Sequence, residues 1–204
     1  FLLVGDMVLK NDHSQMPRVV SAIRDVHAGS LVACFGNEEY EQSREEYKRI
    51  GEVTWLDDEA TVIEVGGVTL GIVGSRGSLD RPTFWQRTHV KGIWQTYRRR
   101  VEVIDSLLAG MEAEVRVVMA HYAPTYRTLV GEMERAWPEM ASKRLEGVIE
   151  RRQPDVWLHG HAHRGRVGEA WFGRTLVVNT SLPARGEIVL LDLPMNPPQQ
   201  KLCV

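Results

Sequence analysis

Residues 156–163 read Val-Trp-Leu-His-Gly-His-Ala-His, and this stretch decides how the rest of the chain is interpreted. Its apolar start is typical of a strand buried on both faces. The histidines that follow lie where a parallel or mixed sheet presents its loops, and imidazole is the commonest metal ligand. The stretch therefore predicts a metal site at the end of an interior strand. His159 shares the alternation, but we interpret it as a structural residue.

Three other segments show the same arrangement, a buried strand followed at once by polar residues. Phe1-Leu2-Leu3-Val4 ends in Gly5-Asp6, residues 31–35 end in Gly36-Asn37-Glu38-Glu39, and residues 115–120 end in His121. Because strand ends of one kind meet at the same edge of a sheet, we expect their side chains to converge. The predicted metal ligands are Asp6, Asn37, His121, His161 and His163.

This ligand set mixes oxygen and nitrogen donors, which suits manganese, iron or zinc better than calcium or magnesium alone. Acidic and imidazole groups that converge at strand ends can hold two ions about 3.5–4 Å apart. A carboxylate can bridge such a pair because it has two oxygens. The residue types therefore favour a dinuclear centre that activates water for attack on phosphorus.

The rest of the chain alternates between helical and strand periods, with one long loop over residues 75–90. Gly66-Gly67 predicts the turn of a hairpin. We expect helices over residues 16–26, 39–50, 93–111 and 138–152, the last with Pro138 in its first turn. Further strands are expected over residues 61–65, 68–73, 175–179 and 187–193.

Composition limits the classes of function. The 204 residues fit one domain, residues 1–204. Two cysteines, Cys34 and Cys203, form no disulfide framework, which favours a reducing compartment and a cytoplasmic location. The formal net charge of -2 favours neither nucleic acid nor an anionic membrane as a partner. The arginines at 98–100 are interpreted as a solvated helix face in preference to an anion site. Trp85 and Trp94 fit a substrate mouth and a packed loop equally well.

The ordered set Gly5-Asp6, Gly36-Asn37-x-Glu39, His121 and Gly160-His161-x-His163 resembles the motif series of the calcineurin-like metallophosphoesterases. The resemblance implies an α/β fold, a four-layer α/β/β/α sandwich of two mixed sheets flanked by helices. It also implies two divalent metal ions, with manganese favoured, and hydrolysis of a phosphomonoester or phosphodiester by a metal-bridging hydroxide. The expected partner is a phosphorylated small molecule.

The same resemblance assigns roles to the predicted ligands. Asp6 would bridge the two ions, Asn37, His121 and His161 would complete the shell of the second ion, and His163 would serve the first. Glu38 and His121 are the candidate catalytic residues.

The sequence departs from the family pattern twice. Glu38 stands where the family usually has a histidine that assists the leaving group; a glutamate can do this only as a neutral acid. The family also begins with a strand that carries Asp-x-His, and Asp12-His13 does not replace it, because it follows Asp6 in a polar turn. We therefore expect a preceding strand–helix unit of roughly 25–40 residues, the length that a βαβ crossover requires.

Two rival functions come from other classes. A non-catalytic scaffold that kept the fold and lost the metals would explain the missing Asp-x-His and the changed Glu38, but nothing structural demands His121 or the Gly-His-x-His motif. A nuclease is disfavoured, because the chain has neither the length for a DNA-contacting domain nor a basic stripe. A metal-dependent phosphoesterase is therefore the preferred function.

Overall fold

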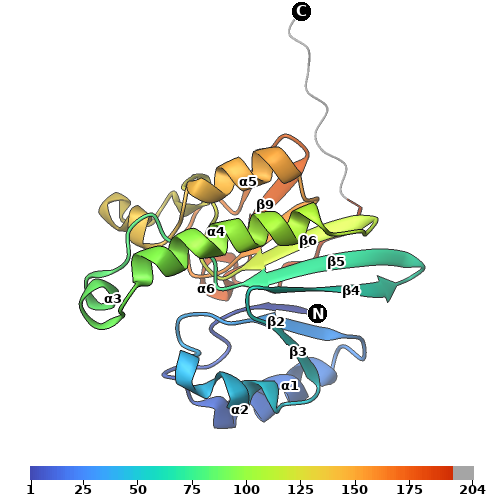
Figure 1. Cartoon of the computed structure of the whole chain (residues 1–204). Helices are drawn as coiled ribbons and strands as arrows, with labels where there is room; N and C mark the ends of the chain where they lie inside the picture. The colour runs from blue at the N-terminus through green and yellow to red at the C-terminus, as the bar shows by residue number, and fades with distance from the viewer. Residues whose placement is uncertain (195–204) are drawn as a thin grey trace, which may run out of the picture.

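Two β-sheets pack face to face in the computed structural model, which describes residues 1–194 (Figure 1). The first sheet has the order β1-β2-β3, with every strand parallel, and comprises β1 (Leu2–Val4), β2 (Leu31–Cys34) and β3 (Val53–Leu56). The second sheet has the order β4-β5-β6-β7-β9-β8. Its strands are β4 (Glu59–Val65), β5 (Val68–Ser75), β6 (Val115–Ala120), β7 (Val156–His159), β8 (Glu169–Phe172) and β9 (Thr175–Asn179).

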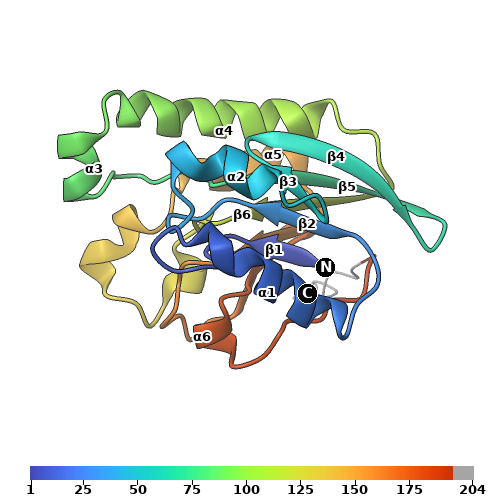
Figure 2. The ribbon, with the colours of Figure 1, turned by 90° about the horizontal axis from the view of Figure 1, so that it is seen from below.

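Helices cover the outer faces of both sheets and complete four layers (Figures 1 and 2). The three-stranded sheet carries α1 (Met16–Arg24) and α2 (Arg44–Lys48), and the six-stranded sheet carries α4 (Ile93–Ala109) and α5 (Arg144–Arg152). Two short helices, α3 (Phe84–His89) and α6 (Leu182–Arg185), lie in the connections. None of the helices within residues 1–194 has the length and apolarity to cross a membrane.

The central strands of the second sheet are largely apolar because both of their faces are mostly buried. β5, β6, β7 and β9 run parallel, with antiparallel β4 and β8 at the edges. Helices pack on one face of this sheet and the first sheet packs on the other, so a strand such as β9 has no exposed residue. All the carboxyl ends of the parallel strands therefore point the same way, and the loops that follow them gather at one end of the molecule.

Side chains from the two sheets interlock between the layers. Cys34 and Leu56 of the first sheet pack against Ile72 and Met119 of the second. The sheets come closest at Gly74 of β5, where a Cβ atom would overlap that of Leu56 and lie 3.0 Å from its Cδ1. The absence of a side chain at this position lets β5 approach β3.

The predicted four-layer sandwich is confirmed, and two of its strands, β6 and β9, have the expected bounds. One detail of the prediction was wrong, since only the second sheet is mixed. Two short strands, β3 and β8, were not predicted; each has four residues and lies at the edge of its sheet. The expected loop over residues 75–90 contains α3, which begins with a capping box between Thr83 and Gln86.

Three other predicted elements were wrong or displaced. Within residues 1–194, no β-ladder includes residues 187–193; Val189 and Leu191 pack against the core between the sheets instead. The helix expected at Pro138 begins at Arg144, because the backbone before it bonds to distant segments: Asp80 N donates to Ala141 O at 2.9 Å.

The helix predicted over residues 39–50 is also shorter. A 3₁₀ turn, Glu41–Ser43, precedes α2, and Tyr40 N donates to Asn11 Oδ1 at 2.9 Å. This backbone group is therefore bonded to another segment. Cys34 is a buried free thiol, and Cys203 lies outside the described residues.

We expect Gly74→Ala to lower the free energy of unfolding by about 1–3 kcal/mol, because the added methyl group forces the sheets apart. The control is Gly51→Ala, which has no atom within 4 Å of the new methyl group and should change stability by less than about 0.5 kcal/mol. Urea denaturation of both variants measures the difference. Equal stability of the two variants would contradict the proposed close approach.

Candidate metal centre

The site forms where β1, β2, β6 and β7 end, and two glycines let these ends meet. Gly5 has a φ of +78°, and a Cβ there would lie 2.6 Å from Gly36 N and 2.7 Å from His121 Nδ1. A Cβ on Gly36 would lie 2.5 Å from Asp6 N. Real Cβ atoms do not approach neighbours so closely, so glycine is required at both positions. The glycines that precede Asp6 and Asn37 in the sequence thus have a steric purpose.

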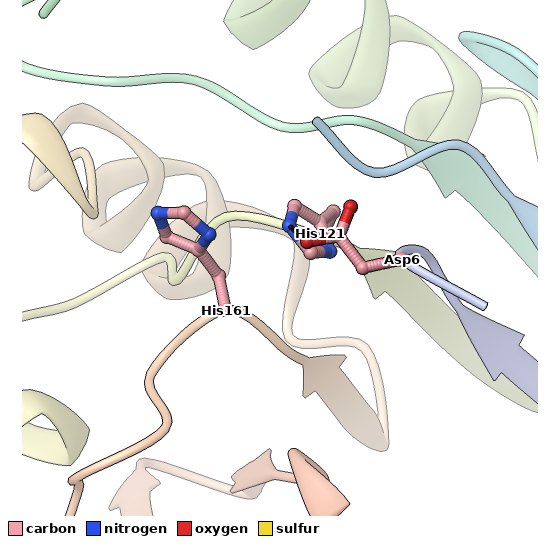
Figure 3. A group of neighbouring side chains, drawn as sticks. All are labelled: Asp6, His121 and His161. Carbon is pink, nitrogen blue, oxygen red and sulfur yellow. Dashed lines mark ion pairs between the residues drawn. The ribbon is translucent and has the colours of Figure 1, made fainter. Parts of the chain in front are cut away.

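Three of the predicted ligands form one compact group. The donor atoms of Asp6, His121 and His161 all lie within 4.8 Å of one another (Figure 3). Asn37 joins this group, since its Oδ1 lies 3.0 Å from His121 Nε2. Asp6 and Asn37 come from the first sheet, and the two histidines come from the second. The site is therefore built across the gap between the sheets.

The hydrogen bonds of His121 fix its tautomer. Its Nδ1 lies 3.0 Å from the carbonyl oxygen of Val4, which can only accept, so Nδ1 carries the proton. In the neutral ring Nε2 then has a lone pair, and it faces Asn37 Oδ1 at 3.0 Å and Asp6 Oδ2 at 3.2 Å. His121 Nε2, Asn37 Oδ1 and Asp6 Oδ2 are all electron-rich and lie close together. A neutral His121 ring places no proton between them.

This arrangement fits a divalent cation. Metal-bound histidines commonly donate their second ring N–H to a backbone carbonyl, as His121 does to Val4. Zinc-type bonds of about 2.0–2.2 Å place neighbouring donors about as far apart as these lie. The residues present therefore match the chemistry of a metal site.

The electrostatics also keep the donor atoms free of protons. Burial alone would raise the pKa of Asp6, but its contact with the His121 ring and the hydrogen bond from the Glu38 N–H bring the pKa below its ordinary value. Burial and the proximity of His121 lower the pKa of His161 to about 3. Both groups are therefore deprotonated at neutral pH, as metal ligands must be.

Glu39 organises the site and was not predicted as a site residue. Its buried carboxylate accepts the backbone N–H groups of Gly36 at 2.6 Å, Met7 at 2.7 Å and Asp6 at 2.8 Å. Burial raises the pKa of Glu39, and two of these bonds partly offset the rise. The Gly-Asn-x-Glu motif contained this residue, but only the fold shows that it ties the loop after β1 to the loop after β2.

Glu38 and His163 stand outside the compact group. Glu38 is half-buried, and its carboxylate accepts Lys10 N at 2.7 Å and Asn37 Nδ2 at 3.4 Å. His163 is exposed, and its donor atoms are not among those within 4.8 Å of one another. The ligand role of His163 and the catalytic role of Glu38 therefore stay predictions.

His159 has the structural environment that we expected. It is fully buried in β7, with Nε2 2.7 Å from Thr128 Oγ1 and Nδ1 2.9 Å from Gly160 O. Burial lowers its pKa to about 4, so the ring is neutral at ordinary pH. Both nitrogens are already bonded, which leaves none for a metal.

We expect Glu39→Gln to lower the free energy of unfolding by about 1–3 kcal/mol, because its amide NH2 replaces one of the two acceptor oxygens and faces at least one backbone N–H donor. Glu45→Gln, on the exposed surface of α2, is the matched control and should be close to neutral. Thermal or urea unfolding measures both. An unchanged Glu39→Gln variant would show that these three hydrogen bonds do not hold the loops together.

Comparison with known proteins supports the fold. No protein-family model and no curated protein matches the sequence. The phosphopantetheinyl hydrolase PptH from Mycobacterium tuberculosis has a TM-score of 0.69 at 14% identity, over 97% of this chain and 87% of that chain. The sulfate thiohydrolase SoxB of Thermus thermophilus, solved with glycerol, has a TM-score of 0.52 at 19% identity, over 88% of this chain and 33% of that one.

At sequence identities this low, the structural similarity is evidence about the fold and not about the reaction. The sheet order, the four layers and the polar residues at the strand ends agree with the motif series in the sequence. The chain therefore has the fold of the calcineurin-like metallophosphoesterases.

Proposed function

We propose that this protein is a metal-dependent phosphoesterase that hydrolyses a phosphomonoester or phosphodiester. The observation that carries the proposal is the convergence of Asp6, Asn37, His121 and His161, with the His121 proton held on Nδ1. Such a ligand set, in this fold, supports hydrolase chemistry. The similarity to a phosphopantetheinyl hydrolase supports a small phosphorylated substrate.

The predicted ligands would be shared between two metal ions. Asp6, Asn37, His121 and His161 would hold one divalent ion, and His163 would contribute to a second that shares Asp6. Bound ions of this kind polarise phosphoryl oxygens and lower the pKa of water. Manganese is the favoured metal, and iron and zinc also suit the donors. A cytoplasmic location remains part of the proposal.

Several contacts orient these ligands before any substrate binds. The Glu38 N–H donates to Asp6 Oδ1 at 2.7 Å, which leaves Oδ2 directed at His121. Val4 fixes the His121 ring, and Glu39 holds the backbone of Asp6. Preorganised ligands of this kind need no rearrangement as charge develops on the phosphoryl group.

Glu38 is the proposed proton donor to the leaving oxygen, in the position where the family usually has a histidine. Its half-buried carboxyl group follows Asn37 directly and lies at the rim of the ligand group. In this structure its carboxyl group acts as an acceptor, since it accepts the Lys10 N–H at 2.7 Å. Donation to a substrate therefore requires Glu38 to gain a proton, and His121 is the other candidate catalytic residue.

A non-catalytic scaffold is the second candidate. The observation that favours it is the exposure of His163 away from the compact group, which leaves the second ion few ligands. Metal content separates the two proposals: two ions for each chain support the enzyme, and none after reconstitution supports the scaffold.

With Mn²⁺ added, we expect hydrolysis of an activated aryl phosphate or phosphodiester, and His161→Ala should lower kcat/KM by at least about 100-fold, since a lost ligand removes both charge stabilisation and water activation. Mn²⁺ should raise the melting temperature of the wild type, but not of Asp6→Asn. His89→Ala, on the exposed side of α3, is the control and should keep both properties. Unchanged turnover in His161→Ala would overturn the proposed mechanism.

Substrates with different leaving groups test whether Glu38 is the proton donor. An alkyl phosphate needs a proton on its leaving oxygen, whereas a nitrophenyl phosphate does not. We therefore expect Glu38→Gln to lose about 10²–10⁴-fold on the alkyl ester and little on the aryl ester, and Glu38→His to recover activity on the alkyl ester. Equal effects on both esters would exclude Glu38 as the acid.

A further inference from the structure

The segment that connects β5 to the start of α4 carries an unusual local charge. Between Arg81 and Val101 the sequence has six Lys or Arg residues and no Asp or Glu, although the whole chain has a formal net charge of -2. Arg81 pairs with Glu139, and Arg100 pairs with Asp58. Within residues 1–194, the other four cations have no ion pair: Arg87, Lys91, Arg98 and Arg99.

Large aromatic side chains are exposed among these cations. Phe84 is 74% exposed, Trp85 62% and Trp94 39%. Trp94 and Arg98 are four residues apart on α4 and so share one side of that helix. We call the group formed by Phe84, Trp85, Arg87, Lys91, Trp94 and Arg98 the aromatic–basic face. Exposed aromatic groups gathered in this way mark an interaction site on a protein surface.

The face is held rigidly on the fold. Thr83 caps α3 through a reciprocal hydrogen bond with Gln86, and the rings of Trp85 and His89 stack with centroids 5.0 Å apart. Arg81, two residues before Thr83, bonds to Glu139 and to the Arg135 carbonyl. Because its supports are fixed, the face loses little conformational entropy on binding.

The face also lies at the same end of the molecule as the metal site. α3 projects at the left of Figure 1, the end at which the strands before the site terminate. Tyr97 of α4 packs on Tyr122, and Tyr122 packs on His161 with ring centroids 5.0 Å apart. A surface bound by the aromatic–basic face would therefore lie beside the opening of the site.

We propose that the aromatic–basic face binds the surface of an anionic lipid bilayer. Tryptophan and phenylalanine rings settle at the level of the lipid headgroups, and neighbouring arginines keep their charge in water while their stems cover apolar surface. The three cations of the face, Arg87, Lys91 and Arg98, have no ion pair within residues 1–194 and are complementary to acidic headgroups. The net charge of the whole chain conceals this local excess. The proposal does not depend on the phosphoesterase activity.

The arrangement fits a bilayer better than a protein or a nucleic acid. Protein interfaces are also enriched in aromatic residues and arginine but are depleted of lysine, whereas this face includes Lys91 and its segment carries cations alone. Binding of single-stranded nucleic acid uses a basic groove that follows the backbone, but α3 is a projecting tip. Insertion into a headgroup layer needs only a projection with apolar rings and cations around them.

Vesicle binding tests the proposal with the full chain. We expect it to sediment with vesicles of phosphatidylcholine mixed with phosphatidylglycerol, more weakly with phosphatidylcholine alone, and less at high salt. Phe84→Ser/Trp85→Ser should remove binding, and Arg87→Gln/Lys91→Gln should weaken it about 30-fold at low ionic strength. The control Lys48→Gln/Arg49→Gln removes two exposed cations from the end of α2, in the opposite layer, and should bind as the wild type does.

Three results would overturn the proposal. They are equal binding to both kinds of vesicle, equal binding by the face variants and the α2 control, and displacement of the protein from vesicles by a short single-stranded oligonucleotide at lower concentration than by added anionic lipid. Melting temperatures check that each variant folds. Because none of these measurements uses turnover, failure here leaves the phosphoesterase proposal untouched.

Discussion

One hydrogen bond between the two sheets fixes the centre of the site. His121 Nδ1 donates to the carbonyl of Val4 over 3.0 Å, and it joins the end of β6 to the end of β1. This bond sets both the distance between the strand ends and the tautomer of the ring. Without it, the lone pair of Nε2 would not be directed at Asp6 and Asn37. The close contact of Gly5 with Gly36 makes room for the bond.

Charge imposes a second constraint on the same region. Asp6, Glu38 and Glu39 place three carboxyl groups around the strand ends, and the buried one, Glu39, is stabilised by backbone N–H groups. Asp6 Oδ2 and His121 Nε2 instead face each other at 3.2 Å. A cation is the simplest group that satisfies them together, which links the fold to metal-dependent chemistry.

The loops at this end of the fold are held to each other and not only to their own strands. Asp80 accepts hydrogen bonds from Tyr126, Ser142 and the Lys143 backbone. This hub connects the segment that carries α3 to the loops after β6. Hydrogen bonds to Asp80 therefore connect the surroundings of the site to the segment that carries α3.

Much of this protein could be predicted from the sequence, because the decisive signals are local. The mainly apolar runs of β6 and β9 predicted their bounds, since strands buried on both faces are rich in apolar residues. Glycine and polar residues directly after such runs identified Asp6, Asn37, His121 and His161 as neighbours. Position at a strand end is enough to bring side chains together once strands are parallel.

Only the tertiary structure decided the remaining features, because they depend on partners far away in the chain. Residues 187–193 alternate like a strand but pair with no other strand within the described part of the chain. Near Pro138, backbone carbonyls expected in the first turn of a helix accept hydrogen bonds from Asp80 and Ala123 instead. Glu39 gained its role from three N–H groups that converge only when the loops after β1 and β2 meet. Local sequence records the preference of each segment, whereas pairing and burial are decided by which segments the fold brings into contact.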